Sequence, residues 1–89
     1  MNVLYTFYMN KKFVEIIGWY GVIAILLAYL LNSLNIINSS NIFYSLLNLT
    51  GALGIMVDAW RQKNYQPVVL NLVWALVAII TLTKLFFIN

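Results

Sequence analysis

Three long apolar stretches, separated by two short polar segments, restrict how this chain of 89 residues can fold. They cover about residues 16–34, 42–60 and 67–88. As helices they would be about 28–33 Å long, which matches a hydrocarbon core of about 30 Å. Because backbone groups find no water partners in that core, helices are the expected structure. We predict an all-α integral membrane protein whose three transmembrane helices pack as a small bundle.

The composition supports a membrane environment. Hydrophobic residues make up 64% of the chain and charged residues 8%, whereas soluble domains average about 25% charged residues. So few charges could not cover the surface of a water-soluble protein of this size. We expect the lipid bilayer to be a partner, and we expect no nucleic-acid partner, because the basic residues flank the apolar stretches and are better explained as membrane-orienting charges.

The basic residues also predict the orientation of the chain. Lys11 and Lys12 precede the first stretch, Arg61 and Lys63 lie between the second and third, and the first loop, residues 32–41, has no Lys or Arg. The chain crosses the membrane twice between these two basic sites, so both sites lie on the same side of the membrane. The positive-inside rule puts that side in the cytoplasm.

The predicted organisation is a cytoplasmic N-terminal segment, residues 1–15, followed by a transmembrane domain, residues 16–88. The C-terminus is expected outside, and the membrane is expected to be the bacterial cytoplasmic membrane. The natural start is left open between Met1 and Met9, because the segment MNKKFVEIIGW, residues 9–19, resembles an N-terminus.

Local signals mark the ends of the helices. Ser40 or Asn41 is expected to cap the second helix, since both side chains accept hydrogen bonds from helical N–H groups. Pro67 suits the first turn of the third helix, where a backbone N–H has no helical partner. Asp58 is expected to pair with Arg61, three residues further along the second helix.

Small and polar residues form one stripe on each predicted helix. At 100° per residue these residues share about a third of the helix circumference. Small side chains let helix backbones approach closely in lipid, where no hydrophobic force drives association. We therefore expect the stripes to face one another. Their members are Gly18, Gly21, Ala24, Ala28 and Asn32; Ser45, Asn48, Gly51, Ala52, Ile55 and Ala59; and Asn71, Trp74, Ala75, Ala78 and Leu82.

Asn48, Asn71 and Trp74 are the candidate functional residues. Two interpretations of the asparagines stay open: they hydrogen-bond neighbouring helices, or they line a polar path for a small solute. The first is favoured on the residues alone. Trp74 shares a face with Asn71 and is the aromatic residue expected to touch a ligand, if one binds.

The residue types argue against catalysis. The chain has no cysteine and no histidine, and Glu15 and Asp58 are its only acidic residues. Neither acid has a candidate nucleophile or metal partner near it in the sequence. We predict no enzyme activity, no cofactor and no metal site.

Four linked motifs resemble a known family. The segments IGWYG (residues 17–21), AYLL (28–31), LLNLTGALG (46–54) and, after a proline, LNLVW (70–74) are similar to a family of short bacterial three-helix membrane proteins. The resemblance covers about residues 13–85. It implies the three-helix fold, and the family has no assigned function.

A more distant resemblance is to the SemiSWEET (PQ-loop) half-transporters, which are short, have three helices and pair around a central solute path. Pro67 and Asn71 are similar to the proline and the solute-contacting asparagine of those proteins. The first helix departs from their pattern because it has no Pro-Gln pair. The predicted outside position of the first loop also differs from theirs.

Three functions follow as hypotheses. The first is a structural or accessory subunit whose helices pack against copies of the chain or another membrane protein. The alternative is a homo-oligomeric, SemiSWEET-like carrier of a small polar solute. A pore-forming, holin-like protein is a weaker third hypothesis, because such chains usually carry more basic residues or a strongly amphipathic helix.

The predicted orientation can be tested by labelling single cysteines in intact cells. A membrane-impermeant thiol reagent should modify Ser39→Cys from outside and leave Gln62→Cys protected, because the basic residues hold the second loop in the cytoplasm. The opposite pattern would overturn the orientation, and equal labelling would indicate dual topology.

Overall fold

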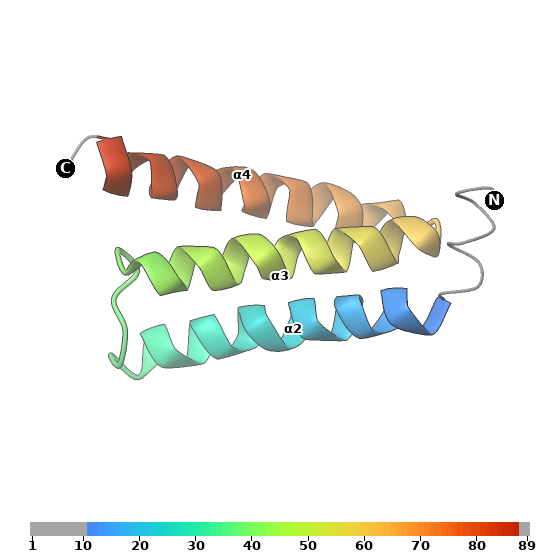
Figure 1. The fold of residues 1–89 in the computed structure, drawn as a ribbon, viewed down its shortest axis with the longest axis horizontal. Coiled ribbons are helices and arrows are strands. Elements are labelled where there is room, and N and C mark those ends of the chain that lie inside the picture. Colours follow the sequence, from blue (N-terminus) through green and yellow to red (C-terminus); the bar gives the residue numbers. More distant parts are fainter. Residues whose placement is uncertain (1–10, 88–89) are drawn as a thin grey trace.

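The computed structural model describes residues 11–87, and all of its regular structure is α-helical (Figure 1). The three helices are α2 (Lys11–Ser33), α3 (Ile42–Arg61) and α4 (Tyr65–Phe87). They contain 23, 20 and 23 residues and are long and apolar enough to cross a membrane. The predicted three-helix, all-α architecture is therefore confirmed for the described residues.

Two helices begin earlier than predicted. α2 begins at Lys11 rather than near residue 16, because Lys and Glu are good helix formers and extend the helix beyond the apolar stretch. The predicted N-terminal segment, residues 1–15, therefore overlaps α2. α4 begins at Tyr65, so Pro67 lies in the first helical turn as expected. The choice between Met1 and Met9 concerns residues outside the described range.

Side chains and turns define the helix ends. Asn41 is the N-cap of α3, and its side-chain oxygen accepts a hydrogen bond of 2.8 Å from the Phe43 N–H. Beyond α2 and α3 the chain turns through Asn35 (φ 62°) and Lys63 (φ 57°). In both turns, backbone N–H groups bond back to carbonyls of the last helical turn, as in a Schellman motif. Because both connections are short, α3 runs antiparallel to α2 and to α4.

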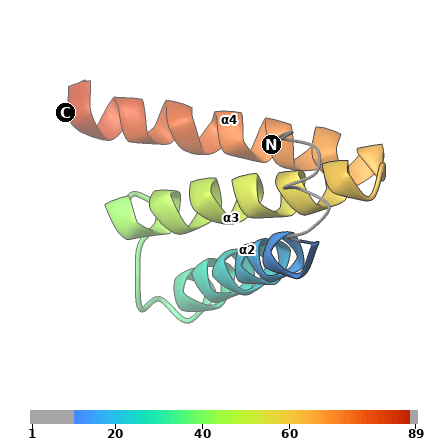
Figure 2. The same ribbon diagram turned by 45° about the vertical axis from the view of Figure 1, so that its right-hand side comes forward.

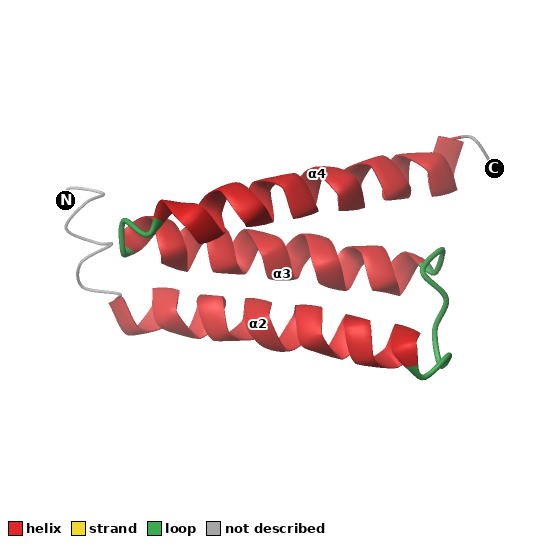
Figure 3. Ribbon diagram, turned by 180° about the vertical axis from the view of Figure 1, so that it is seen from behind, coloured by secondary structure: helices red, strands yellow, loops and turns green. Residues whose placement is uncertain are grey.

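α3 is the central helix. α2 and α4 each pack along α3 and have far less contact with each other. Figures 1 and 2 show α3 between the other two helices in both views, and Figure 3 shows the same order from behind. α4 diverges from α3 toward its C-terminal end (Figure 1). The fold is thus an open array of three helices rather than a closed bundle.

Glycines bring α2 and α3 into backbone contact. A Cβ atom built on Gly51 would lie 2.9 Å from the carbonyl oxygen of Gly21, and one on Gly21 would collide with the Gly51 carbonyl oxygen. A Cβ on Gly54 would lie 2.6 Å from the Ile17 carbonyl oxygen. Real Cβ atoms do not approach this closely, so these positions require glycine at this helix spacing. The IGWYG and LLNLTGALG motifs meet at this crossing.

The predicted small-residue stripes face one another. Ala28 and Ala52 are fully buried, and most other members of the stripes are buried as well. Asn32, Ile55 and Leu82 are half-buried, and Trp74 is exposed. The predicted stripes did not include Gly54, which is also buried. Most Leu, Ile and Val side chains on the other faces are exposed, as expected of helices that pack through small residues. The buried packing residues are Gly18, Gly21, Ala28, Gly51, Ala52, Ala75 and Ala78.

Substituting the crossing glycines should separate α2 from α3. Gly21→Leu or Gly51→Leu should lower the free energy of unfolding by about 1–3 kcal/mol or more, because the new side chain must displace a backbone. Reversible unfolding in mixed micelles, followed by circular dichroism, measures this change. Ile80→Leu is the matched control, since Ile80 is 56% exposed. Equal stability of the glycine variants and the control would contradict the packing described here.

Candidate functional site

A groove lies where α4 diverges from α3, next to the loop between α2 and α3. Its volume is about 370 Å³. We call it the α3–α4 groove, because its walls come only from α3, α4 and the loop that leads into α3. Most of its lining residues carry an uncharged polar group, but most of the exposed lining surface is apolar. The lining residues are Ser39, Ser40, Tyr44, Ser45, Asn48, Trp74, Val77, Ala78 and Thr81.

Asn48 and Trp74 connect the two helices at the base of this groove. The indole Nε1–H of Trp74 donates a hydrogen bond of 3.0 Å to Oδ1 of Asn48. The Asn48 amide donates a second bond of 2.9 Å to the Tyr44 carbonyl oxygen, within α3. Asn48 is 7% exposed, whereas Trp74 is 46% exposed. The interhelical hydrogen bond expected for Asn48 is therefore present, and Trp74 is its partner.

Asn71 has a different role from the one expected. It is also 7% exposed, but its amide donates to the Pro67 carbonyl oxygen within α4, at 2.8 Å. Within residues 11–87 it forms no hydrogen bond to another helix, and it does not line the α3–α4 groove. The two asparagines therefore have different roles: Asn48 links α3 to α4, whereas Asn71 forms its hydrogen bond within α4.

The sequence interpretation assigned no binding role to the hydroxyl groups around the groove. Thr81 donates its hydroxyl hydrogen to the Val77 carbonyl oxygen, and Ser40 donates to Oδ1 of Asn38. Both hydroxyl oxygens keep lone pairs that can accept further hydrogen bonds. Thr81 could have been found by helical spacing, because it lies seven residues after Trp74 and hence on the same face of α4.

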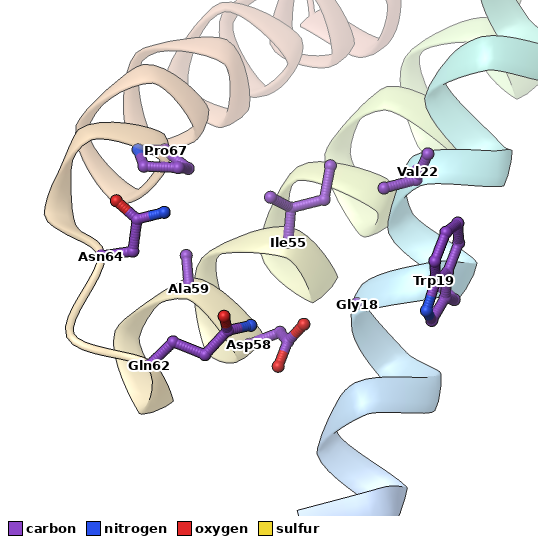
Figure 4. A pocket seen from close by; sticks show the side chains of 9 residues that line it. All are labelled: Gly18, Trp19, Val22, Ile55, Asp58, Ala59, Gln62, Asn64 and Pro67. Atoms are coloured by element: carbon purple, nitrogen blue, oxygen red, sulfur yellow. The ribbon is translucent and has the colours of Figure 1, made fainter.

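A second cavity, of about 330 Å³, lies at the opposite end of the molecule, between α2, α3 and the start of α4. We call it the Asp58 cavity. Figure 4 shows the Asp58 side chain extending from α3 toward Gly18 of α2. A Cβ atom on Gly18 would lie 2.5 Å from Oδ2 of Asp58, so this glycine makes room for the carboxylate. The cavity is lined by Gly18, Trp19, Val22, Ile55, Asp58, Ala59, Gln62, Asn64 and Pro67.

An ion-pair network holds Asp58. Arg61 donates to Oδ1 of Asp58 at 2.9 Å through its terminal nitrogen, which confirms the pair expected from the sequence. The same nitrogen lies 3.7 Å from Oε1 of Glu15 on α2. The Asp58 and Arg61 side chains are about one-fifth exposed. One arginine therefore serves carboxylates from two helices near their ends.

The acidic side chains of the described residues lie in one place, and these residues form no cluster of metal-ligating groups. Between Lys11 and Phe87 there is no group of three Asp, Glu, His or Cys side chains that could hold a metal ion. In the same range, both acidic side chains belong to the network around Arg61. The arrangement can bind and pack, and its polar groups are suited to hydrogen bonding.

Comparison with known proteins identifies the family. The chain matches a small family of uncharacterised proteins over residues 14–89, so it belongs to that family. This is consistent with the predicted membership of a family of unassigned function. No curated protein and no solved structure matches the chain. The more distant resemblance to SemiSWEET half-transporters therefore has no support from comparison.

The Asn48–Trp74 hydrogen bond can be measured by a double-mutant cycle. Asn48→Leu and Trp74→Phe should each destabilise the fold, and their coupling energy should be about 0.6 kcal/mol and at most about 1.7 kcal/mol, as for other hydrogen bonds between membrane helices. Unfolding in mixed micelles provides the free energies. The cycle of Asn71→Leu with Trp74→Phe is the control and should show almost no coupling. Equal coupling in the two cycles would contradict the assignment.

Proposed function

We propose that the chain is a small integral membrane subunit that acts by packing its helices against a second copy of itself. The observation that carries this proposal is the open arrangement of the helices: α2 and α4 both pack on α3 but scarcely touch each other. The small residues already pack between the helices of a single chain. A partner helix can therefore pack in the recess on the side where α2 and α4 flank α3.

The open side has room for a further helix. On α3, Gly51, Gly54 and Asp58 face α2, whereas Ser45 and Asn48 face α4. At 100° per residue these two faces are about 100–120° apart around α3. A helix placed in the angle between α2 and α4 can then contact all three helices. The Asp58 cavity lies in this angle, since residues of α2, α3 and α4 line it together.

The chain also carries a ridge that fits such a groove. The exposed face of α2 has apolar residues spaced alternately by three and four positions, which is the spacing of a helix-packing seam. All of them are at least half exposed. A second copy can supply this ridge, and no other protein is then required. The ridge residues are Ile16, Trp19, Ile23, Leu26 and Leu30.

The proposal includes the location of the chain. Three apolar helices of sufficient length support insertion in a membrane, and we place the protein in the bacterial cytoplasmic membrane with its N-terminus inside. The ion-pair network around Arg61 and the basic Lys63 lie at the end of the molecule that holds the α3–α4 connection. In this orientation that end faces the cytoplasm, and the α3–α4 groove opens toward the outside.

A second candidate function is a homo-oligomeric carrier of a small polar solute. The α3–α4 groove favours it, because Asn48 and Trp74 lie together with several hydroxyl groups on one recessed surface. Asn71, the third residue assigned to the path, lines neither cavity. The carrier therefore has a binding surface but a shorter polar path than the sequence predicted.

The oligomeric state in lipid tests the subunit proposal. The chain in phosphatidylcholine bicelles should be dimeric by analytical ultracentrifugation, and Val22→Trp should shift it toward monomer by at least about tenfold in dissociation constant, because the indole fills the Asp58 cavity. Leu76→Trp, on an exposed part of α4 outside both cavities, is the control and should leave the dimer intact. A monomer at all concentrations, or equal effects of the two variants, would contradict self-association through this side.

A further inference from the structure

We infer that the α3–α4 groove is a binding site for an uncharged, hydroxyl-rich group such as a polyol or a sugar. The inference rests on the chemistry of the lining residues and on the shape of the groove. It concerns binding alone and holds whether the chain acts as a subunit or as a carrier. Every lining residue comes from α3, α4 or the loop before α3, so one copy of the chain forms the complete site.

The lining selects a neutral ligand. Seven of the nine lining residues carry a hydroxyl, amide or indole N–H group, and none carries a charge. The two remaining residues, Val77 and Ala78, are small and apolar. An ion entering the groove would lose water without meeting an opposite charge, which is unfavourable in an apolar environment. A hydroxyl group both donates and accepts hydrogen bonds, so it can match such a surface without charge.

Hydrogen-bonding capacity remains inside the groove. The Asn48 amide uses one donor for the Tyr44 carbonyl oxygen, and its Oδ1 accepts from Trp74. An amide has a second N–H and its oxygen a second lone pair, so Asn48 can serve a ligand while it keeps both bonds. Thr81 donates within α4, which leaves its oxygen as an acceptor. Ser45 adds a hydroxyl on the α3 wall, although the residue is 2% exposed and therefore lies behind the groove surface.

Trp74 supplies the apolar part of the surface. Its indole is held by the bond from Nε1 to Asn48, yet the residue stays 46% exposed and lines the groove. A fixed and accessible aromatic body suits a ligand with C–H groups between its hydroxyls. The volume of about 370 Å³ falls at the lower end of the range for small-molecule sites, about 300–1,000 Å³.

Two sources can provide this chemistry: a free polyol or sugar, and the glycerol or sugar headgroup of a lipid. The experiment separates them. The full chain carrying Trp19→Phe and Trp60→Phe is placed in phosphatidylcholine nanodiscs, so that Trp74 is its only tryptophan. Detergents with sugar headgroups are avoided. Emission of Trp74 is recorded while glucose, glycerol or gluconate is added. Gluconate is the matched probe, because it resembles glucose in size but carries a carboxylate.

Two variants test the assignment. Asn48→Leu should weaken the response to glucose or glycerol by at least about tenfold, because it removes the amide at the base of the groove. Asn71→Leu is the matched control, since Asn71 is equally buried but lies outside the groove, and it should change the affinity by less than about twofold. A Ser45→Ala variant, which removes only the hydroxyl oxygen, should weaken binding without unfolding the chain.

The expected result is a saturable shift of Trp74 emission with glucose or glycerol and a much weaker one with gluconate. If the source is a lipid headgroup, nanodiscs containing a glycosyl-diacylglycerol should already show the shift, and added glucose should change it little. The inference is overturned if neither free probes nor the glycolipid shift the emission. It is also overturned if gluconate acts as well as glucose, or if Asn71→Leu weakens binding as much as Asn48→Leu.

Discussion

The close approach of α2 to α3 at Gly21 and Gly51 is the contact on which the rest of this structure depends. Each glycine lies against the backbone of the other helix, so neither position accepts a Cβ atom at this spacing. The same crossing places Gly18 against Asp58, and Asp58 with Arg61 then reaches Glu15 at the helix ends. If lipid surrounds the chain, packing of this kind takes the place of the hydrophobic force that holds soluble helices together.

The α3–α4 contact has a different chemistry, and the candidate site follows from the difference. α4 buries only a narrow strip containing Asn71, Ala75 and Ala78, and it diverges from α3 toward its C-terminal end (Figure 1). The Asn48–Trp74 hydrogen bond crosses the gap where the helices begin to separate. Tight packing on one side of α3 and a looser, polar contact on the other give the chain a stable pair of helices and an accessible groove.

Much of the fold could be predicted from the sequence because lipid permits few structures and because small residues reveal the packing faces. The Asn41 cap and the Asp58–Arg61 pair were also predictable, since both depend on residues close together in the chain. Helix order was not predictable in this way. Whether α3 or α4 is the central helix depends on how complete helix faces fit together. With α3 in the centre, Asn48 bonds Trp74 of α4, whereas Asn71 bonds only its own helix. The groove hydroxyls become a site only after α3 and α4 are placed together.

The most direct test of the α2–α3 crossing is disulfide formation between paired cysteines in cells that produce the protein. A Cβ atom on Gly51 would lie 3.3 Å from the Cβ of Ala24 and 2.9 Å from the Gly21 carbonyl oxygen. The helices must therefore move apart slightly to accept this cysteine, and a shift of about a few tenths of an ångström also brings the two Cβ atoms into the range of about 3.5–4.5 Å that a disulfide requires. Ala24→Cys with Gly51→Cys should therefore cross-link rapidly and within one chain under mild oxidation. Ala24→Cys with Ala75→Cys, which pairs α2 with α4, should not. Cross-linking of the second pair with the first pair unreacted would show that α4, and not α3, packs on α2 and would contradict this account.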